Sequence, residues 1–366
     1  MRTLVISDLH LGARNGRPAL DEPDVLEALK RSVGEADRLV LLGDVLEMRQ
    51  LPARDALAAA GHVLTELAGA LGPDTEVVYV PGNHDHGLLD AWDARRRRNA
   101  PPAPLELDTE VDWLDGEPLA ELVSLLASAG ASVTVRYPGV WLREDVYATH
   151  GQYLDCRTAT PSFERLAAGL HARFMKLPLD SLSSPDDYER LLTPVYAWMG
   201  AIVERGGITD PGGSGFSERL LRLLGSGSPL ARVAQAGLGS VTVILRLAGL
   251  GKVNSDLSGG GLARASARGL GDALESLRIR APYVVFGHSH CACPLPGDAD
   301  DAWVTALGTQ LLNCGCWVRE RLDDFNPATA SSSPYRAGFA VEFDGLETPR
   351  LVNLLDQLQQ GQVSED

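Results

Sequence analysis

The strongest constraint in this sequence is a set of five polar clusters, each of which directly follows an apolar run of strand-forming residues. Open α/β sheets keep their ligand sites at the carboxyl ends of their strands, so polar side chains at these ends can converge. The clusters are SDLH with Asp8 and His10, GD with Asp44, GNHD with Asn83, His84 and Asp85, THG with His150, and GHSH with His288 and His290.

Histidine is concentrated in these clusters. The chain has eight histidines, and six of them lie in or beside a cluster, counting His86 directly after the third. His288 and His290 stand two residues apart, so on a strand both imidazoles would lie on the same face. A pair of surface histidines in a turn is the alternative for this stretch, but the other clusters favour one shared binding site.

The strand-forming runs predict an α/β fold. Runs at 3–7, 38–43 and 76–81 are separated by helical patterns such as 53–71, which favours a largely parallel layer. A further helix is predicted near 117–129. The runs at 132–137, 139–144 and 145–150 lie close together, as antiparallel strands do, and predict a mixed second sheet. Further strands are predicted at 282–287, 303–308 and 337–344.

The pattern changes to amphipathic helices between Asp155 and about Leu277. We therefore predict a core formed by residues 1–155 and 276–366, with residues 156–275 as a helical insertion. The insertion begins after the cluster with His150 and ends before the strand that leads to His288. Both of its ends should therefore emerge beside the site, which favours a cap there. Glycine-rich joints at 212–215 and 258–261 would let parts of it move. Its apolar stretch at 241–251 predicts either a face for an apolar substrate and peripheral membrane contact, or a wholly buried packing face.

Charge and cysteine content restrict the function classes. Lys+Arg 33 against Asp+Glu 49 gives a formal charge of −16, which opposes binding of long nucleic acid. The first residues read directly as a strand, without a signal-peptide pattern. The longest uncharged apolar window, between Arg232 and Arg246, has 13 residues and is too short to span a bilayer. Five cysteines, an odd number, indicate reduced thiols and a cytoplasmic protein.

The residue types in the clusters are those of a metal site. Imidazole, carboxylate and amide oxygen together suit Mn²⁺, Fe²⁺ or Zn²⁺. Seven such side chains exceed the needs of one tetrahedral ion and suit two ions that share a carboxylate. The candidate ligands are Asp8, His10, Asp44, Asn83, His150, His288 and His290.

The five motifs, in this order, resemble those of the calcineurin-like metallophosphoesterases. Their pattern is D-x-H, G-D, G-N-H-[DE], H and G-H-x-H, and the resemblance covers residues 1–155 and 280–350. It implies a four-layer α/β/β/α sandwich of two mixed sheets. It also implies hydrolysis of a phosphodiester, pyrophosphate or monoester by a dinuclear metal centre.

The same resemblance implies a role for each matching residue. Asp8, His10 and His290 would hold one metal ion, and Asn83, His150 and His288 would hold the other. Asp44 would bridge the two ions. His84 would protonate or stabilise the leaving group, with Asp85 orienting its ring. Gly43, Gly82 and Gly287 would let the backbone turn sharply at the site.

Three features are similar to bacterial UDP-2,3-diacylglucosamine diphosphatases: GDVLEMR at 43–49, the helical insertion, and LLNCGCW at 311–317. They imply a substrate with an apolar or lipid moiety. His84 stands where those diphosphatases carry Arg. A nucleotide phosphodiesterase or nuclease of the same fold is the alternative, which the net charge opposes. A metal-binding scaffold without turnover is a further alternative, which the complete ligand set opposes.

The remaining candidates have structural interpretations. The pairs Cys291/Cys293 and Cys314/Cys316 could form a zinc site, but small buried thiols are favoured because their spacing is atypical for zinc. The arginine run at 95–98 could meet a phosphate, although a solvated loop over 94–111 is favoured. His62 is predicted to be solvated and His171 structural. His86 either lines the cleft or is incidental. The substrate contacts and the oligomeric state are left open.

Overall fold

The computed structural model describes residues 1–14, 17–98, 101–157, 178–205, 259–299, 301–319 and 333–356. The chain divides into two compact units. The first comprises Met1–Gly151, Ala281–Val304 and Gly308–Asp366, and the second Gln152–Arg280 and Thr305–Leu307. The second unit thus runs from 152 to 280, where the sequence predicts an insertion over 156–275.

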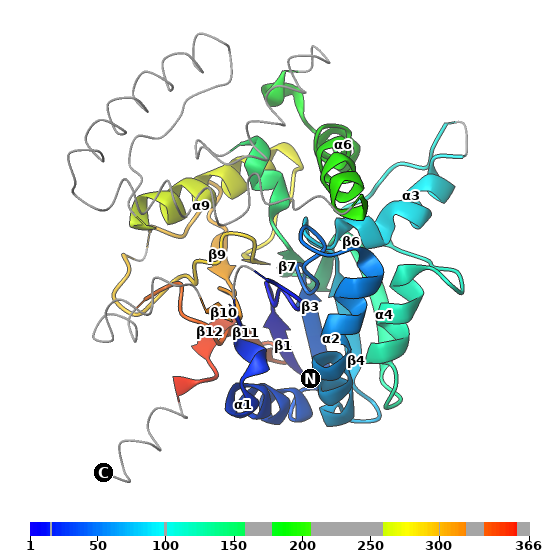
Figure 1. The fold of residues 1–366 in the computed structure, drawn as a ribbon. Coiled ribbons are helices and arrows are strands. Elements are labelled where there is room, and N and C mark those ends of the chain that lie inside the picture. The colour runs from blue at the N-terminus through cyan, green and yellow to red at the C-terminus, as the bar shows by residue number, and fades with distance from the viewer. Residues whose placement is uncertain are drawn as a thin grey trace, which may run out of the picture. The chain divides into compact units, whose positions relative to one another are not determined.

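A large mixed sheet forms the centre of the first unit (Figure 1). Its order is β12-β11-β1-β3-β4-β6-β7-β8-β9, with β5 beside β6, and β2 and β10 form a separate pair. The strands are β1 (Arg2–Ile6), β2 (Arg17–Pro18), β3 (Arg38–Leu42), β4 (Glu76–Val80), β5 (Asp108–Glu110), β6 (Ser132–Arg143), β7 (Val146–Thr149), β8 (Tyr283–Phe286), β9 (Gln310–Asn313), β10 (Val318–Arg319), β11 (Phe339–Asp344) and β12 (Arg350–Asn353).

Strand directions follow the predicted pattern at most positions. β1, β3 and β4 are parallel neighbours, and so are β7, β8 and β9. The runs predicted as separate strands at 132–137 and 139–144 form one strand, β6. This strand continues through Pro138 and changes partner, from parallel β4 to antiparallel β7.

The strand predicted at 303–308 is wrong. This stretch forms turns with an isolated bridge from Val304 to Gln310, and the strand, β9, follows at Gln310–Asn313. The indole of Trp303 donates to the carboxylate of Asp298 at 2.9 Å, and Gly308 adopts a φ of 82°. These local turns prevent an extended backbone.

Helices cover the sheet beside β1, β3 and β4, where α1, α2 and α4 lie next to one another (Figure 1). Alternate residues of β1 separate two cores: Leu4 and Ile6 pack with these helices, while Val5 belongs to the cluster on the other face. The helical elements are η1 (Ala19–Asp21), α1 (Pro23–Gly34), α2 (Ala53–Ala70), η2 (His86–Leu89), α3 (Asp90–Arg96) and α4 (Pro118–Leu126).

The segment expected as an exposed loop, 94–111, is partly regular. Helix α3 ends inside it at Arg96, and β5 forms at Asp108–Glu110. Arg95 forms ion pairs with Asp112 and Glu117, which fastens the segment to the residues before α4.

The second unit is built around two long helices. They are α6 (Pro185–Glu204) and α9 (Gly259–Ser276), accompanied by η3 (Gln152–Cys156) and η4 (Leu179–Ser181). Ser184 and Asp187 form a capping box at the start of α6. The rings of Tyr153 and Tyr188 stack at 4.6 Å between centroids. No helix in the described parts of the chain is long and apolar enough to cross a membrane.

Several predictions for the insertion fall outside the described residues. They concern the helix with His171, the joint at 212–215 and the apolar stretch at 241–251. The joint expected at 258–261 is not a separate linker in its described part, because α9 begins at Gly259. Glycine is tolerated in a helix, although its conformational freedom makes it less favourable there than alanine.

Candidate metal centre

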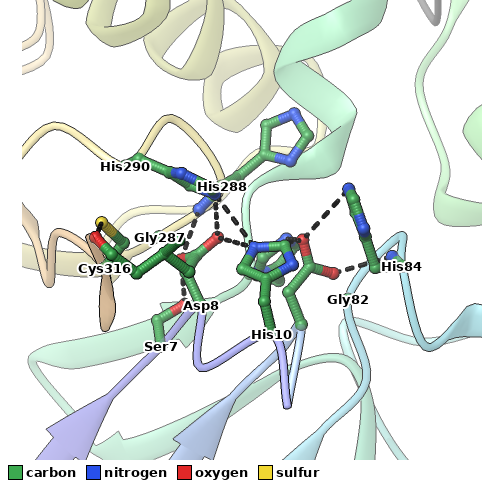
Figure 2. A network of polar contacts seen from close by, with 12 residues as sticks. Ser7, Asp8, His10, Gly82, His84, Gly287, His288, His290 and Cys316 are labelled. Carbon is green, nitrogen blue, oxygen red and sulfur yellow. Dashed lines mark hydrogen bonds and ion pairs between the residues drawn. The ribbon is translucent and has the colours of Figure 1, made fainter. Parts of the chain in front are cut away.

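The predicted clusters lie at the carboxyl ends of five strands. Asp8 follows β1, Asp44 follows β3, Asn83 follows β4, His150 follows β7 and His288 follows β8. Figure 2 shows Asp8 and His10 between the loop that carries His288 and His290 and the loop that carries His84. Groups with the spacing of metal ligands form here, all from the predicted residues. They are Asp8–His10–His290, Asp44–His150–His288 and His10–Asp44–His84.

The first group joins Asp8, His10 and His290. The Nε2 atoms of the two histidines are 3.0 Å apart. Asp8 Oδ1 lies 3.2 Å from His290 Nε2 and 3.8 Å from His10 Nε2. Asp8 and His10 are buried, whereas the His290 side chain is partly exposed. The site is therefore held by its buried members and has an accessible side at His290.

The second group joins Asp44, Asn83, His150 and His288. Asn83 Oδ1 lies 3.0 Å from His150 Nε2 and 2.9 Å from His288 Nδ1. Asp44 Oδ2 lies 3.2 Å from His150 Nε2 and 3.8 Å from His10 Nε2. The same carboxylate oxygen therefore approaches ligands of both groups, which is the position that a bridging residue needs.

These contacts are compatible with a bound cation. The Asn83 oxygen faces the ring nitrogens of His150 and His288, and the reverse amide orientation would instead donate to them. Asp8 Oδ1 is buried and accepts no hydrogen bond. Lone pairs that face one another in a buried site repel unless a cation or proton lies between them. The donor set of imidazole, carboxylate and amide oxygen suits divalent transition metals.

Hydrogen bonds behind the ligands fix the histidine tautomers. His150 Nδ1 lies 2.9 Å from the Leu42 carbonyl, which only accepts, so this nitrogen carries the proton and Nε2 faces the site. His10 Nδ1 lies 3.1 Å from Glu47 Oε2 in the same relationship. Such outer partners orient metal-binding imidazoles and raise their basicity.

The expected role of Asp85 is not what the structure shows. Its carboxylate accepts from the backbone N–H groups of Gly82 at 2.6 Å and Val45 at 2.7 Å, and so fastens the two ligand loops together. The His84 ring is held by Glu47 instead, with both carboxylate oxygens 2.9 Å from Nδ1. Asp85 thus binds backbone donors, while Glu47 occupies the place beside the His84 ring.

Glu47 is the most important residue that the sequence did not reveal. It is buried and contacts two histidines of different predicted roles, the ligand His10 and the proton-transfer candidate His84. The only sequence signal is its place three residues after Asp44 in GDVLEMR. Arg49, in the same segment, is also buried, and its charge contributes to lowering the pKa of His84.

The ligands sit on an unusual backbone. Of the six non-glycine residues with positive φ in the described chain, five are candidate ligands. A left-handed conformation costs a non-glycine residue of order 1–3 kcal/mol and persists only where the surroundings enforce it. The cost indicates that these turns are kept for the geometry of the site. The five are Asp8 (58°), His10 (46°), Asp44 (52°), His288 (67°) and His290 (57°).

Three glycines permit the close approach of these loops, and a Cβ atom at one of them, Gly82, would overlap Asp44 Oδ1. Gly43 has a φ of 84°, and a Cβ atom there would overlap the His150 ring. A Cβ atom at Gly287 would overlap Ser7 Oγ and Asp8 Oδ2. Ser7 in turn donates to Leu42 O at 2.7 Å and contacts Asp8 Oδ2 at 2.5 Å. The glycines thus allow neighbouring ligand loops to pack closely against one another, in addition to the expected sharp turns.

Electrostatics divide the buried groups into anions and cations. Burial disfavours ionisation, but the neighbouring histidines hold the pKa values of Asp8, Asp44 and Glu47 below their usual range. Burial also disfavours the charged imidazoles, yet carboxylates raise the pKa of His10 to about 9, Asp8 and Glu47 contributing most. Asp44 is the main cause that raises the pKa of His150 to about 9.

The groups near the leaving-group candidate behave differently. Burial and the charge of Arg49 lower the pKa of His84. Burial and the charge of Asp44 raise the pKa of Asp85 to about 6. Of His10, His84 and His150, His84 therefore gives up a proton most readily.

None of the other candidates belongs to a described group with metal-ligand spacing. All five cysteines are free and buried, and no described group with metal-ligand spacing contains a cysteine. In the arginine run, Arg95, Arg96 and Arg97 pair with nearby carboxylates, which supports the structural interpretation. His86 is buried beside Tyr137, with 5.8 Å between the ring centroids. His62 is exposed on α2, and His171 lies outside the described residues.

Glu47→Gln tests whether one carboxylate supports both histidines. A glutamine cannot accept from both Nδ1–H groups equally, so His10 should bind metal less well and His84 should lose its orientation. We expect about 10–100-fold weaker metal binding, as for other outer-layer residues. Chelator competition measures it. The matched control is Glu189→Gln, a buried glutamate that binds Tyr153 and Thr193 in the second unit. Equal metal affinities in both variants would contradict the role of Glu47.

Metal binding should strengthen with pH. Since the raised pKa values of His10 and His150 are about 9, both rings are protonated near neutral pH without metal. Metal binding must then release these protons, and each one makes the apparent dissociation constant fall about tenfold per pH unit below the pKa. The gain should level off near pH 9. Chelator competition across this range, with proton release measured by calorimetry, checks it; a flat profile would contradict it.

The comparison with known proteins agrees with this geometry. A family model described as calcineurin-like phosphoesterase matches residues 1–198, which is more than half of the 366 residues. The match includes every predicted cluster up to His150, and the structure adds His288 and His290 to the same site. Among curated proteins, none matches the chain. The chain belongs to the calcineurin-like phosphoesterase family.

Proposed function

We propose that the protein hydrolyses phosphoesters at a centre of two divalent metal ions. The observation that carries this proposal is the position of Asp44, whose Oδ2 lies within 4 Å of ligand nitrogens from both groups, His150 at 3.2 Å and His10 at 3.8 Å. One carboxylate between two complete ligand sets is the arrangement of a bridged metal pair. Asp8, His10 and His290 would hold one ion, and Asn83, His150 and His288 the other.

The metal ions would supply the electrophilic part of the chemistry. Bound divalent cations stabilise charge on phosphoryl oxygens and lower the pKa of water. The protein's share is to orient the ligands, which the outer contacts of His10 and His150 support. Burial of Asp8 and Asp44 keeps competing water from these carboxylates.

His84 would handle the proton of the leaving group. Its Nδ1 is held by Glu47, so Nε2 is the atom left to face the reacting centre, 3.9 Å from Asp44 Oδ2. The ring is less buried than those of His10 and His150, which allows contact with a substrate. Glu47 favours the protonated ring while Arg49 opposes it, a balance that suits a group that donates and regains a proton.

We extend the proposal to the architecture, with the two halves of the sheet packed face to face as a four-layer α/β/β/α sandwich. Support comes from a core cluster that contains Val5 and Val40 of one half together with Ala148, Val285 and Leu312 of the other. Residues 156–275 would then be a helical insertion that acts as a cap.

For the substrate, we propose a phosphoester or pyrophosphate with an apolar or lipid moiety, as in bacterial UDP-2,3-diacylglucosamine diphosphatases. The motifs GDVLEMR and LLNCGCW support this proposal, together with the helical character of the second unit. The protein would act in the cytoplasm, with peripheral membrane contact through the insertion. Mn²⁺, Fe²⁺ or Zn²⁺ are the proposed metals.

Asp44→Asn tests the shared carboxylate. A neutral amide cannot balance two cations, so we expect lower metal content and loss of nearly all turnover. Metal analysis and hydrolysis of a substrate panel measure both; the panel comprises monoesters, diesters and nucleoside-diphosphate lipids. Asp187→Asn, at the capping box of α6, is the control that should keep both properties. Full metal content with near-normal activity in Asp44→Asn would rule out the bridge, and metal-loaded protein inert on the whole panel would favour a scaffold.

His84→Ala tests the proton-transfer role. Poor leaving groups such as alkyl alkoxides need a proton, whereas p-nitrophenolate needs little. We therefore expect a loss of about 10²–10⁴-fold for alkyl esters and a much smaller loss for p-nitrophenyl esters. Rates for a matched pair of esters measure this difference. Equal losses for both esters would instead assign His84 a phosphate-positioning role.

A further inference from the structure

The loop at 287–290 carries two of the proposed ligands on a strained backbone. His288 and His290 have φ angles of 67° and 57°, and Ser289 N–H donates back to Gly287 O at 2.7 Å. A tight turn of this kind needs contacts from outside the loop to persist. The loop lies where β8 ends, so its supports must come from neighbouring strands.

The side chain of Asn313, at the end of β9, supplies such support. Its Nδ2 donates to Gly287 O at 2.9 Å and to Ser289 Oγ at 2.9 Å. Its Oδ1 accepts from Gly315 N–H at 2.8 Å. The side chain is fully buried, and this one amide grips the loop on both sides of His288. Asparagine suits the position because an aspartate has no N–H to donate and a glutamine is longer.

The segment that begins at Asn313 also reaches the other ligand loop. Trp317 N–H donates to the carbonyl of Asp8 at 3.0 Å, and Cys314 N–H donates to Phe286 O at 2.8 Å. Residues 313–317 therefore connect the loop of Asp8 with the loop of His290. Side chains from these two loops meet in the first ligand group.

We propose that Asn313 is a positioning residue of the metal centre. Its amide sets the path of the loop at 287–290 so that His288 and His290 present their nitrogens to different ligand groups. This inference rests on the proposed metal centre and goes beyond it, because the side-chain hydrogen bonds of Asn313 run to Gly287, Ser289 and Gly315, which are not candidate ligands. The competing interpretation is that the amide only stabilises the fold at the end of β9.

Asn313→Asp separates these interpretations. The change keeps the shape and the acceptor for Gly315 but removes both donated hydrogen bonds. The matched control is Asn353→Asp in β12, where the amide likewise donates to a carbonyl, Ala337 O at 3.0 Å, and accepts from Leu355 N–H at 2.9 Å. Ser289→Ala is the milder variant, since it removes one of the two donated bonds.

The measurements are the Mn²⁺ dissociation constant from chelator competition and the melting temperature with and without Mn²⁺. We expect Asn313→Asp to bind Mn²⁺ about 10–100-fold more weakly and to gain less in melting temperature from the metal, since that gain follows the affinity. Ser289→Ala should show a smaller loss. Asn353→Asp should lower the melting temperature equally with and without metal, at unchanged affinity.

Each outcome decides the inference. An unchanged dissociation constant in folded Asn313→Asp would overturn it, and if that variant does not fold, an unchanged constant in Ser289→Ala would do so. Weakened binding in Asn353→Asp to the same degree would also overturn it, since general destabilisation would then explain the effect. If the unaltered protein does not bind Mn²⁺, the proposed metal centre itself is wrong. If Asn313→Asp binds Mn²⁺ and hydrolyses substrate as the unaltered protein does, only the positioning role of Asn313 is wrong.

Discussion

The main physical constraint on the candidate metal centre is that oxygen and nitrogen atoms with lone pairs lie close together in a buried place. Asp8, Asp44 and Asn83 direct oxygen atoms at the ring nitrogens of His290, His150 and His288, at separations near 3 Å. Without positive charge this arrangement is unfavourable, because each buried acceptor has lost its water. Carboxylates raise the pKa values of His10 and His150 to about 9, which favours protons at positions where divalent cations could bind. Binding of a cation there would release these protons.

The need to bring these ligand atoms together also explains why the backbone of their loops adopts unfavourable angles. Five candidate ligands adopt left-handed angles, and hydrogen bonds tie their loops to one another, such as Asp8 N–H to Gly43 O and His10 N–H to Asp44 O. Asp85 adds a further tie between the loops after β3 and β4. No single loop could keep these angles alone. The two hydrophobic clusters on either face of the sheet hold the strand ends in register, and the strand ends in turn hold the ligands.

Sequence patterns were sufficient to propose candidate ligands because each polar cluster follows an apolar strand, a signal that lies along the chain. Asp8, Asp44 and Asn83 could therefore be named, and the parallel order of β1, β3 and β4 expected. Glu47 and Asn313 could not be assigned roles in this way. Glu47 matters because His10 and His84, 74 residues apart in the sequence, both reach it, and Asn313 because β9 pairs with β8. The strand misplaced at 303–308 has a similar cause, since a side-chain bond from Trp303 decides the local backbone.

The supports of the centre come from different strands, and this distribution has a physical consequence. Leu42 at the end of β3 orients His150 after β7, Glu47 orients His10 of the loop after β1, and Asn313 of β9 binds the loop after β8. Each support thus acts on a ligand from another strand, so the metal affinity depends on the pairing of the whole sheet. Conversely, a ligand that binds only the folded protein stabilises it in proportion to its affinity. Metal ions at this centre would therefore stabilise the contacts between strands far apart in the sequence, and the edge of the sheet where the ligands meet would gain the most order.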